Sequence, residues 1–131
     1  MIDPENEVYT RIAVVLREKF PGIDIASEYV NAPPSFPHVS IVLSNSTDIS
    51  RKMTIHDEMT QVMFEINVYS NKIGGKKTEC KRIMKVVDTI LHSMNFIRLS
   101  LTPVPNLEDA SIYRLIARYR VATDGKFFYR R

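Results

Sequence analysis

The chain has 131 residues, of which 44% are apolar and 25% charged, and both values fit one globular domain. Its 18 lysines and arginines exceed its 15 acidic residues by only three, which is too balanced to indicate nucleic acid as the partner. One cysteine excludes an internal disulfide, and no apolar run approaches the ~20 residues that cross a bilayer. The N-terminal residues do not resemble a signal peptide, so we expect a small cytosolic domain without a membrane partner.

The first expected element is a helix that begins near Asp3, Pro4 and Glu5 and ends at Pro21 and Gly22. Apolar residues recur between these limits at helical spacing: Val8, Ile12, Val15, Leu16 and Phe20. A short extended segment is expected at residues 23–30. Three prolines in the segment that follows, up to residue 37, predict a stiff connector, because proline cannot donate a hydrogen bond inside a sheet.

Two strands are expected on either side of an irregular polar stretch. Val39, Ile41 and Leu43 alternate with polar residues in the first strand, and residues 61–70 alternate in the second. The stretch 45–60 between them is either a surface loop or a projecting arm that lies against another molecule. Five of its residues are candidates for a subunit or partner interface: Ile49, Arg51, Lys52, Met53 and Ile55.

The strongest pattern in the chain is the strand at 61–70 followed by a helix. The strand has period two, typical of a half-buried strand, and its apolar face consists of Val62, Phe64, Ile66 and Val68. After a turn at 71–75 the apolar spacing changes to three and four residues, which places one stripe on a helix. The stripe consists of Cys80, Ile83, Met84, Val87, Ile90, Leu91 and Met94. We therefore expect a sheet with this helix packed across it and Cys80 inside the core.

The rest of the chain predicts three more strands. Residues 96–102 alternate and are expected to stop at Pro103 and Pro105, and a turn at 106–109 follows. The longest strand is expected at 111–123, and Asp124 with Gly125 predicts a hairpin to a last strand at 127–131. The order is therefore α-β-β-β-α-β-β-β. It predicts a single α+β domain over residues 1–131, with a mixed, mostly antiparallel sheet, one long helix across it and a shorter N-terminal helix.

One face of the strand at 111–123 carries a basic ridge formed by Arg114, Arg118 and Arg120. Three interpretations of this ridge stay open: a solvated face with partly paired charges, a subunit interface, or a surface that faces a polyanion.

No group of residues predicts catalysis, a metal or a cofactor. Residues 75–78 lie between a strand and a helix but lack the spacing of a phosphate-binding loop. His38, His56 and His92 share no metal-ligand spacing, and the acidic residues after His56 lie in the irregular stretch. We therefore expect no enzyme.

Several segments of the second half resemble the tail terminator (tail completion) proteins of long-tailed phages and prophages. The matching segments are residues 67–72, 75–81, 87–88, 103–109, 112–114, 118–119 and 129–131. The resemblance implies a structural virion protein that forms a ring, usually of six copies, at the head-proximal end of the tail tube. Such a ring is assembled in the bacterial cytoplasm, ends tube polymerisation, contacts the tube protein and the head connector, and lets DNA pass through its lumen.

Two alternatives remain beside the terminator interpretation. Other head–tail joining and stopper proteins of phages share this size and layout. A small non-specific nucleic-acid-binding module would use the basic ridge together with a stacking aromatic residue such as Tyr69 or Tyr119. In a ring, we expect the ridge to face either the lumen, with weak contacts to phosphates, or an acidic patch of the adjacent subunit.

Overall fold

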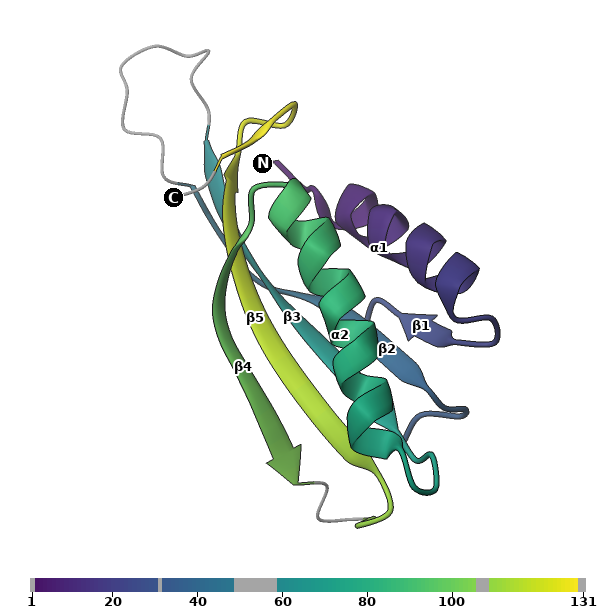
Figure 1. Cartoon of the computed structure of the whole chain (residues 1–131). Coiled ribbons are helices and arrows are strands. Elements are labelled where there is room, and N and C mark those ends of the chain that lie inside the picture. The colour runs from purple at the N-terminus through teal and green to yellow at the C-terminus, as the bar shows by residue number, and fades with distance from the viewer. Residues whose placement is uncertain (1, 31, 49–58, 106–108, 130–131) are drawn as a thin grey trace.

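A computed structural model describes residues 2–30, 32–48, 59–105 and 109–129 of the chain (Figure 1). Its elements follow the predicted order and confirm the α+β class. They are α1 (Glu5–Lys19), β1 (Asp24–Ala26), β2 (His38–Asp48), β3 (Thr60–Ser70), α2 (Lys76–Ser93), β4 (Ile97–Pro105), β5 (Tyr113–Thr123) and β6 (Phe128–Tyr129).

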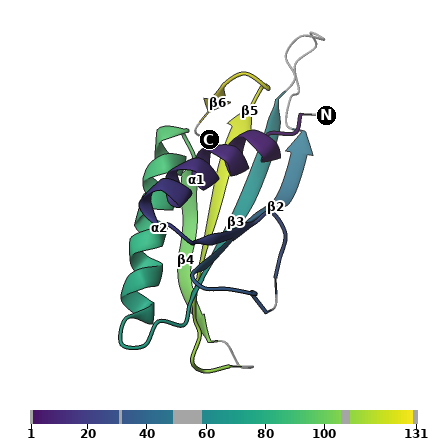
Figure 2. The same cartoon turned by 90° about the vertical axis from the view of Figure 1, so that its right-hand side faces the viewer.

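The strands form one mixed sheet in the order β1-β2-β3-β5-β4, with β6 paired to the end of β5. Only β1 and β2 run parallel among the described pairs, and the others are antiparallel, as predicted. The late strand β5 therefore lies between β3 and β4, and β1 and β4 are the two edges. Both helices lie over the same side of this sheet (Figure 2).

The core lies between α2 and the sheet, where the two predicted apolar patterns meet. The four alternating residues of β3 are fully buried, and so is the stripe of α2 apart from Ile90, which is partly buried. The N-terminal helix α1 packs beside α2 and contributes Val8, Ile12 and Leu16 to the same core. Asn95 ends α2 in the left-handed region, with φ 68°, and its side-chain amide donates to the carbonyl of Phe128 at 2.8 Å.

The predicted end of the fourth strand before Pro103 is wrong, because β4 continues through both prolines to Pro105. Since β4 is an edge strand, one side of its backbone has no neighbour that needs a donor, and proline is tolerated there. The hairpin after β5 is confirmed, with Gly125 at φ 96° in its turn. The described part of the last strand is short, and residues 130 and 131 lie outside the described residues.

The strand at 61–70 was predicted to be half-buried, but one end of β3 is buried on the helix-free side of the sheet as well. His38, Ser40, Asn67 and Tyr69 lie on this side and are at most 2% exposed. The connector after β1 runs on the helix-free side of the sheet (Figure 2), and its Tyr29 reaches the sheet through a hydrogen bond. The prediction failed here because alternation within a strand does not show which loop covers its polar face.

Candidate functional site: the helix-free face of the sheet

The three predicted ridge residues all lie on the helix-free face of β5. The residues between them, including Leu115, Ala117 and Tyr119, are buried in the core on the other face. Across the antiparallel pair with β3, Arg114 lies opposite Tyr69, Arg118 opposite Glu65 and Arg120 opposite Met63. The three arginines differ strongly in their surroundings.

Arg114 is engaged by residues of this chain. Its guanidinium lies 5.1 Å from the ring centre of Tyr29 and 5.4 Å from that of Tyr69, so each ring makes a cation–π contact with it. The Nε and Nη2 atoms donate to Oδ1 of Asn67 at 3.2 and 2.9 Å, and Nη2 also donates to the Tyr29 hydroxyl at 2.6 Å. Arg114 therefore fastens the connector to the sheet.

The polar residues beside Arg114 continue along the same face. The buried amide of Asn67 donates to Oε1 of Glu65 at 3.1 Å, and Oε2 of Glu65 lies 3.5 Å from Nε of Arg118. The Arg118 side chain is 48% exposed, whereas Arg120 is partly buried. Arg118 is thus the most accessible charge of the ridge, and its pairing with Glu65 is weak because solvent screens it.

A second polar cluster on this face was not predicted. Nδ1 of His38 lies 2.7 Å from Oδ2 of Asp24, and Nε2 lies 2.9 Å from Oγ of Ser40. The order Asp, His, Ser is that of a hydrolase triad, but His38 is 1% exposed and Ser40 is 0% exposed. No substrate reaches this hydroxyl, so the cluster joins β1 to β2. These residues meet because β1 and β2 pair in parallel with Asp24 opposite His38. No pattern in the sequence predicts that register, so the cluster could not be predicted.

Asp88 of α2 contacts a buried tyrosine. The hydroxyl of Tyr119 donates to Oδ1 of Asp88 at 2.8 Å, and Nη1 of Arg98 lies 3.5 Å from the same oxygen. Burial, together with this bond to a carboxylate, raises the pKa of Tyr119. The contact ties α2 to β5 and to the edge strand β4.

Unfolding by urea is expected to become easier as the pH rises from 9 to 11. Burial raises the pKa of Cys80 from 9.0 to about 12 and that of Tyr69 from 10.0 to about 12. A raised pKa means that the folded state holds the proton more tightly. Its stabilisation is complete below the unfolded pKa and is lost as the pH rises through the folded value. Urea midpoints measured at several pH values check this. Tyr69→Phe, which keeps the ring over Arg114, should make the decline above pH 10 shallower, and an unchanged slope would contradict this assignment.

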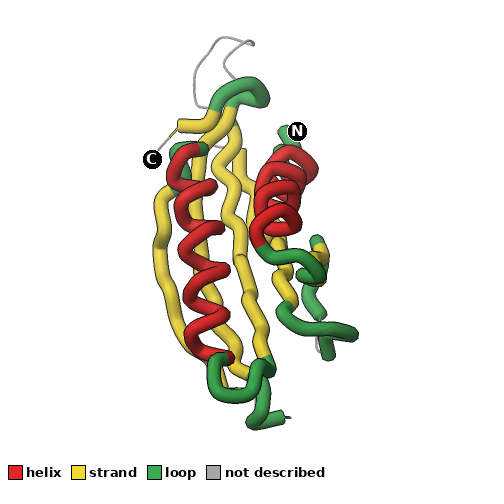
Figure 3. The backbone as a smooth tube through the Cα atoms, turned by 45° about the vertical axis from the view of Figure 1, so that its right-hand side comes forward, coloured by secondary structure: helices red, strands yellow, loops and turns green. Residues whose placement is uncertain are grey.

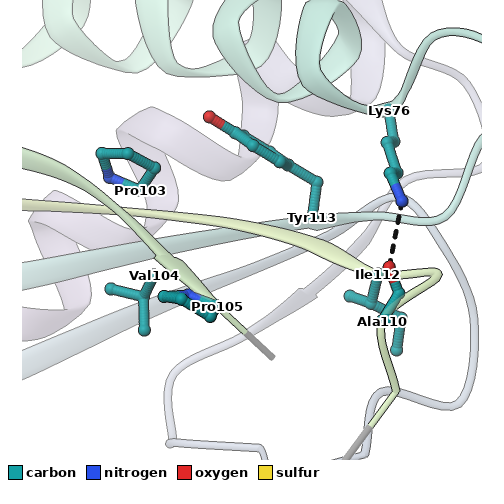
Figure 4. Close-up of a pocket in the computed structure, with 7 residues that line it drawn as sticks. All are labelled: Lys76, Pro103, Val104, Pro105, Ala110, Ile112 and Tyr113. Atoms are coloured by element: carbon teal, nitrogen blue, oxygen red, sulfur yellow. Dashed lines mark hydrogen bonds between the residues drawn. The ribbon is translucent and has the colours of Figure 1, made fainter. Parts of the chain in front are cut away.

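The edge next to β4 has two shallow grooves. The first, with a volume of about 540 Å³, lies between the start of α2, the end of β4 and the start of β5 (Figure 4). Its lining residues are Lys76, Pro103, Val104, Pro105, Ala110, Ile112 and Tyr113. The second groove, of about 330 Å³, runs between α2 and β4 and is lined by Lys81, Met84, Lys85, Asp88, Arg98, Leu101 and Leu115. The first groove is mainly apolar and has one lysine, Lys76, whose Nζ donates to the carbonyl of Ala110 at 3.0 Å. The second combines apolar residues with charged ones of both signs.

The other predicted features have the following positions. The interface candidates Ile49, Arg51, Lys52, Met53 and Ile55 lie outside the described residues. Within the described ranges, no three histidine, cysteine or acidic side chains are grouped in a way that could hold a metal ion. No helix among these residues has the length and apolar character needed to span a bilayer.

No protein-family model matches this chain, and no curated protein matches it either. Among solved structures, the chain is similar to a chain from the virion of a native gene transfer agent particle. The TM-score is 0.68, the match covers 88% of this chain and 90% of that chain, and 17% of the aligned residues are identical. This similarity shows that the two chains share a fold.

Proposed function

We propose that this chain is a structural protein of a phage-type virion and has no enzymatic activity. The observation that carries the proposal is the fold, which nearly the whole length of this chain shares with a chain of a gene transfer agent virion. The sequence resemblance to tail terminator proteins supports the same class, and it was found in segments of the second half of the chain.

Within that virion, we propose that copies of the chain form a ring, with six as the expected number, at the head-proximal end of the tail tube. The ring ends tube polymerisation and joins the tail to the head connector, after assembly in the bacterial cytoplasm. A closed ring needs two different surfaces on each subunit for its head-to-tail contacts. The two edges of the sheet differ in this way, because two grooves lie beside β4 and β1 forms the opposite edge.

The nucleic-acid-binding module is the weaker candidate. Such a module stacks bases on exposed aromatic rings beside its basic residues. Tyr69 is 2% exposed and Tyr119 is 1% exposed, and Tyr119 belongs to the core face of β5. Tyr119 could meet a base only if the core opened, and Tyr69 only if Arg114 and the connector moved away from it.

The proposed function is tested by adding the purified protein to polymerising tail tube protein and measuring tube lengths by electron microscopy. We expect rings in the protein alone, and capped tubes whose mean length falls as the protein concentration rises. Binding to the connector but not to tube ends would indicate a joining or stopper protein instead. A protein that remains monomeric and binds neither component would contradict the proposal.

If the ridge faces the lumen of the ring, changing Arg118 and Arg120 should have a specific effect on DNA association. The variant Arg118→Gln/Arg120→Gln should still form rings but lose weak, salt-sensitive association with DNA of any sequence, because fewer phosphates are neutralised. Arg114 is left intact since it holds the connector. Binding is measured by fluorescence anisotropy at 50 and 200 mM salt, with Lys72→Gln as the exposed control. Loss of rings would assign the residues to a subunit interface, and unchanged rings and DNA association would assign them to a solvated face.

A further inference from the structure

The outer side of α2 holds a concentration of positive charge that the net charge of +3 for the whole chain does not show. Lys77, Lys81 and Lys85 follow one another at four-residue spacing, so they lie in one row along the helix. Arg82 lies next to this row, and all four residues are exposed. We call these four residues the cationic face. The row from Lys77 to Lys85 is roughly 12 Å long, because a helix rises ~1.5 Å per residue.

The two acidic residues of α2 do not neutralise the cationic face. The carboxylate of Glu79 accepts a hydrogen bond from the Ser70 hydroxyl at 2.6 Å. That of Asp88 accepts one from Tyr119 and pairs with Arg98. Among the described residues, none of the four cations of the cationic face forms an ion pair. Like charges four residues apart repel each other, so the row destabilises the helix that carries it.

The cationic face is open to a partner and is entirely polar. In Figures 1 and 3, α2 lies over the sheet with α1 at its side, and no other helix or strand of the described residues covers its outer side. Between residues 77 and 89, lysine, arginine and threonine occupy every exposed position of α2. The two threonines are Thr78 and Thr89.

This composition indicates which kind of partner fits the cationic face. A protein interface has an apolar centre and few lysines, whereas a surface that contacts nucleic-acid phosphates is polar and strongly positive, with lysine, arginine and threonine as donors. Single strands are bound on exposed aromatic rings, and the exposed positions of α2 between 77 and 89 include none. Double-stranded DNA is therefore the partner that the cationic face fits best.

The basic ridge on β5 has fewer charges available for such a partner. Arg114 is held between two tyrosine rings, Arg118 lies 3.5 Å from Glu65, and Arg120 is partly buried. The ridge lies on the helix-free side of the sheet and α2 on the other side (Figure 2). One subunit therefore presents one of the two surfaces to a given stretch of DNA, and the cationic face has the larger number of unpaired charges.

We propose that the cationic face of α2 binds the phosphate backbone of double-stranded DNA without recognising its sequence. Lysine side chains are point charges on flexible stems, so they contact phosphates without a fixed geometry. Few phosphates are neutralised, so the association is weak and decreases as salt increases. All four side chains belong to one subunit, so the inference does not depend on ring formation. In the proposed ring it requires α2, and not the ridge, to face the DNA.

The variant Lys77→Gln/Lys81→Gln/Lys85→Gln tests the inference. Fluorescence anisotropy of a labelled duplex of about 30 base pairs measures binding between 50 and 200 mM salt. At 50 mM salt we expect about tenfold weaker binding. The slope of log affinity against log salt should become shallower by about two to three, since each lost phosphate contact removes ~0.9. Glutamine is a good helix former and removes the repulsion within the row, so the melting temperature should stay the same or rise slightly.

The matched control is Arg11→Gln/Arg17→Gln/Lys19→Gln, which removes three exposed basic side chains from the other helix, α1. Both triple variants change the net charge equally, but α1 also carries three acidic residues and has no cationic row. The control should bind the duplex within about threefold of the unmodified protein. Equal weakening by both variants would show that only net charge matters, which overturns the inference.

Further outcomes separate the alternatives. The ridge variant Arg118→Gln/Arg120→Gln should keep most of the association, and a loss in that variant but not in the lysine variant would make the ridge the DNA surface. Binding of a single strand as tightly as the duplex would contradict the choice of partner. If the lysine variant keeps DNA association but no longer caps tail tubes, the cationic face binds an acidic protein surface and the inference is wrong. If the unmodified protein caps tubes without binding DNA, the inference fails and the proposed function stands.

Discussion

Val87→Asp is expected to leave the protein unfolded or insoluble. Val87 is fully buried in the middle of α2, between the helix and the sheet. A carboxylate there would lose its hydration, and the apolar core residues around it could not donate hydrogen bonds to replace the lost water. The cost is several kcal/mol, a large share of the roughly 5–15 kcal/mol that stabilises a typical domain. Soluble yield and thermal unfolding followed by circular dichroism measure the effect.

The matched control is Arg82→Asp, which places the same side chain on an exposed position of the same helix. It should leave the melting temperature within a few degrees of that of the unmodified protein. Similar melting temperatures for the two variants would be incompatible with packing of α2 across the sheet.

Arg114→Met is expected to lower the free energy of unfolding by roughly 2–4 kcal/mol. The change removes charged hydrogen bonds to Asn67 and Tyr29 and two cation–π contacts, and it leaves the buried Oδ1 of Asn67 without its donor. Equilibrium unfolding in urea gives the value. Hydrogen exchange at residues 27–30 should also become faster, because Arg114 no longer holds the start of the connector.

Arg118→Met is the control for this prediction, since it lies on the same face of the same strand. Its pair with Glu65 is half-exposed, so the loss should not exceed about 1 kcal/mol. If the two methionine variants were equally stable, Arg114 would be another surface arginine and would not hold the connector.

The parts of the fold that could be predicted are those in which one short segment contains its own signal. The apolar stripe from Cys80 to Met94 and the alternation in β3 each define a buried face without reference to distant residues. Together they were sufficient to predict α2 across the sheet. The tight turn at Gly125 is local in the same sense, and it too was found.

The errors concern properties that depend on the assembled sheet. Pro103 and Pro105 were expected to end a strand, but whether proline is tolerated depends on the strand being at an edge, and edge position is decided by the strand order. Burial of Asn67 and Tyr69 depends on a connector more than thirty residues earlier in the sequence.

The candidate site was predicted only as a set of like charges. The ridge was identified correctly as one face of β5, but the sequence did not show that Arg114 is held between Tyr29 and Tyr69 while Arg118 stays accessible. The contact of His38 with Asp24 and Ser40 was missed for a similar reason, since its geometry comes from the parallel pairing of β1 with β2.

The position of β5 has a consequence for how the protein is made. A ribosome completes β3 more than forty residues before it completes β5, yet β5 is the strand that covers the free edge of β3 and supplies the place for β4. Until β5 emerges, the nascent chain contains β2 and β3 as a hairpin whose β3 edge is unpaired. The apolar stripe of α2 then lacks the part of the sheet that β5 and β4 complete. Such intermediates are prone to join other chains through the open edge. Interrupted synthesis before residue 113 should therefore yield aggregates, whereas the finished chain closes its own sheet.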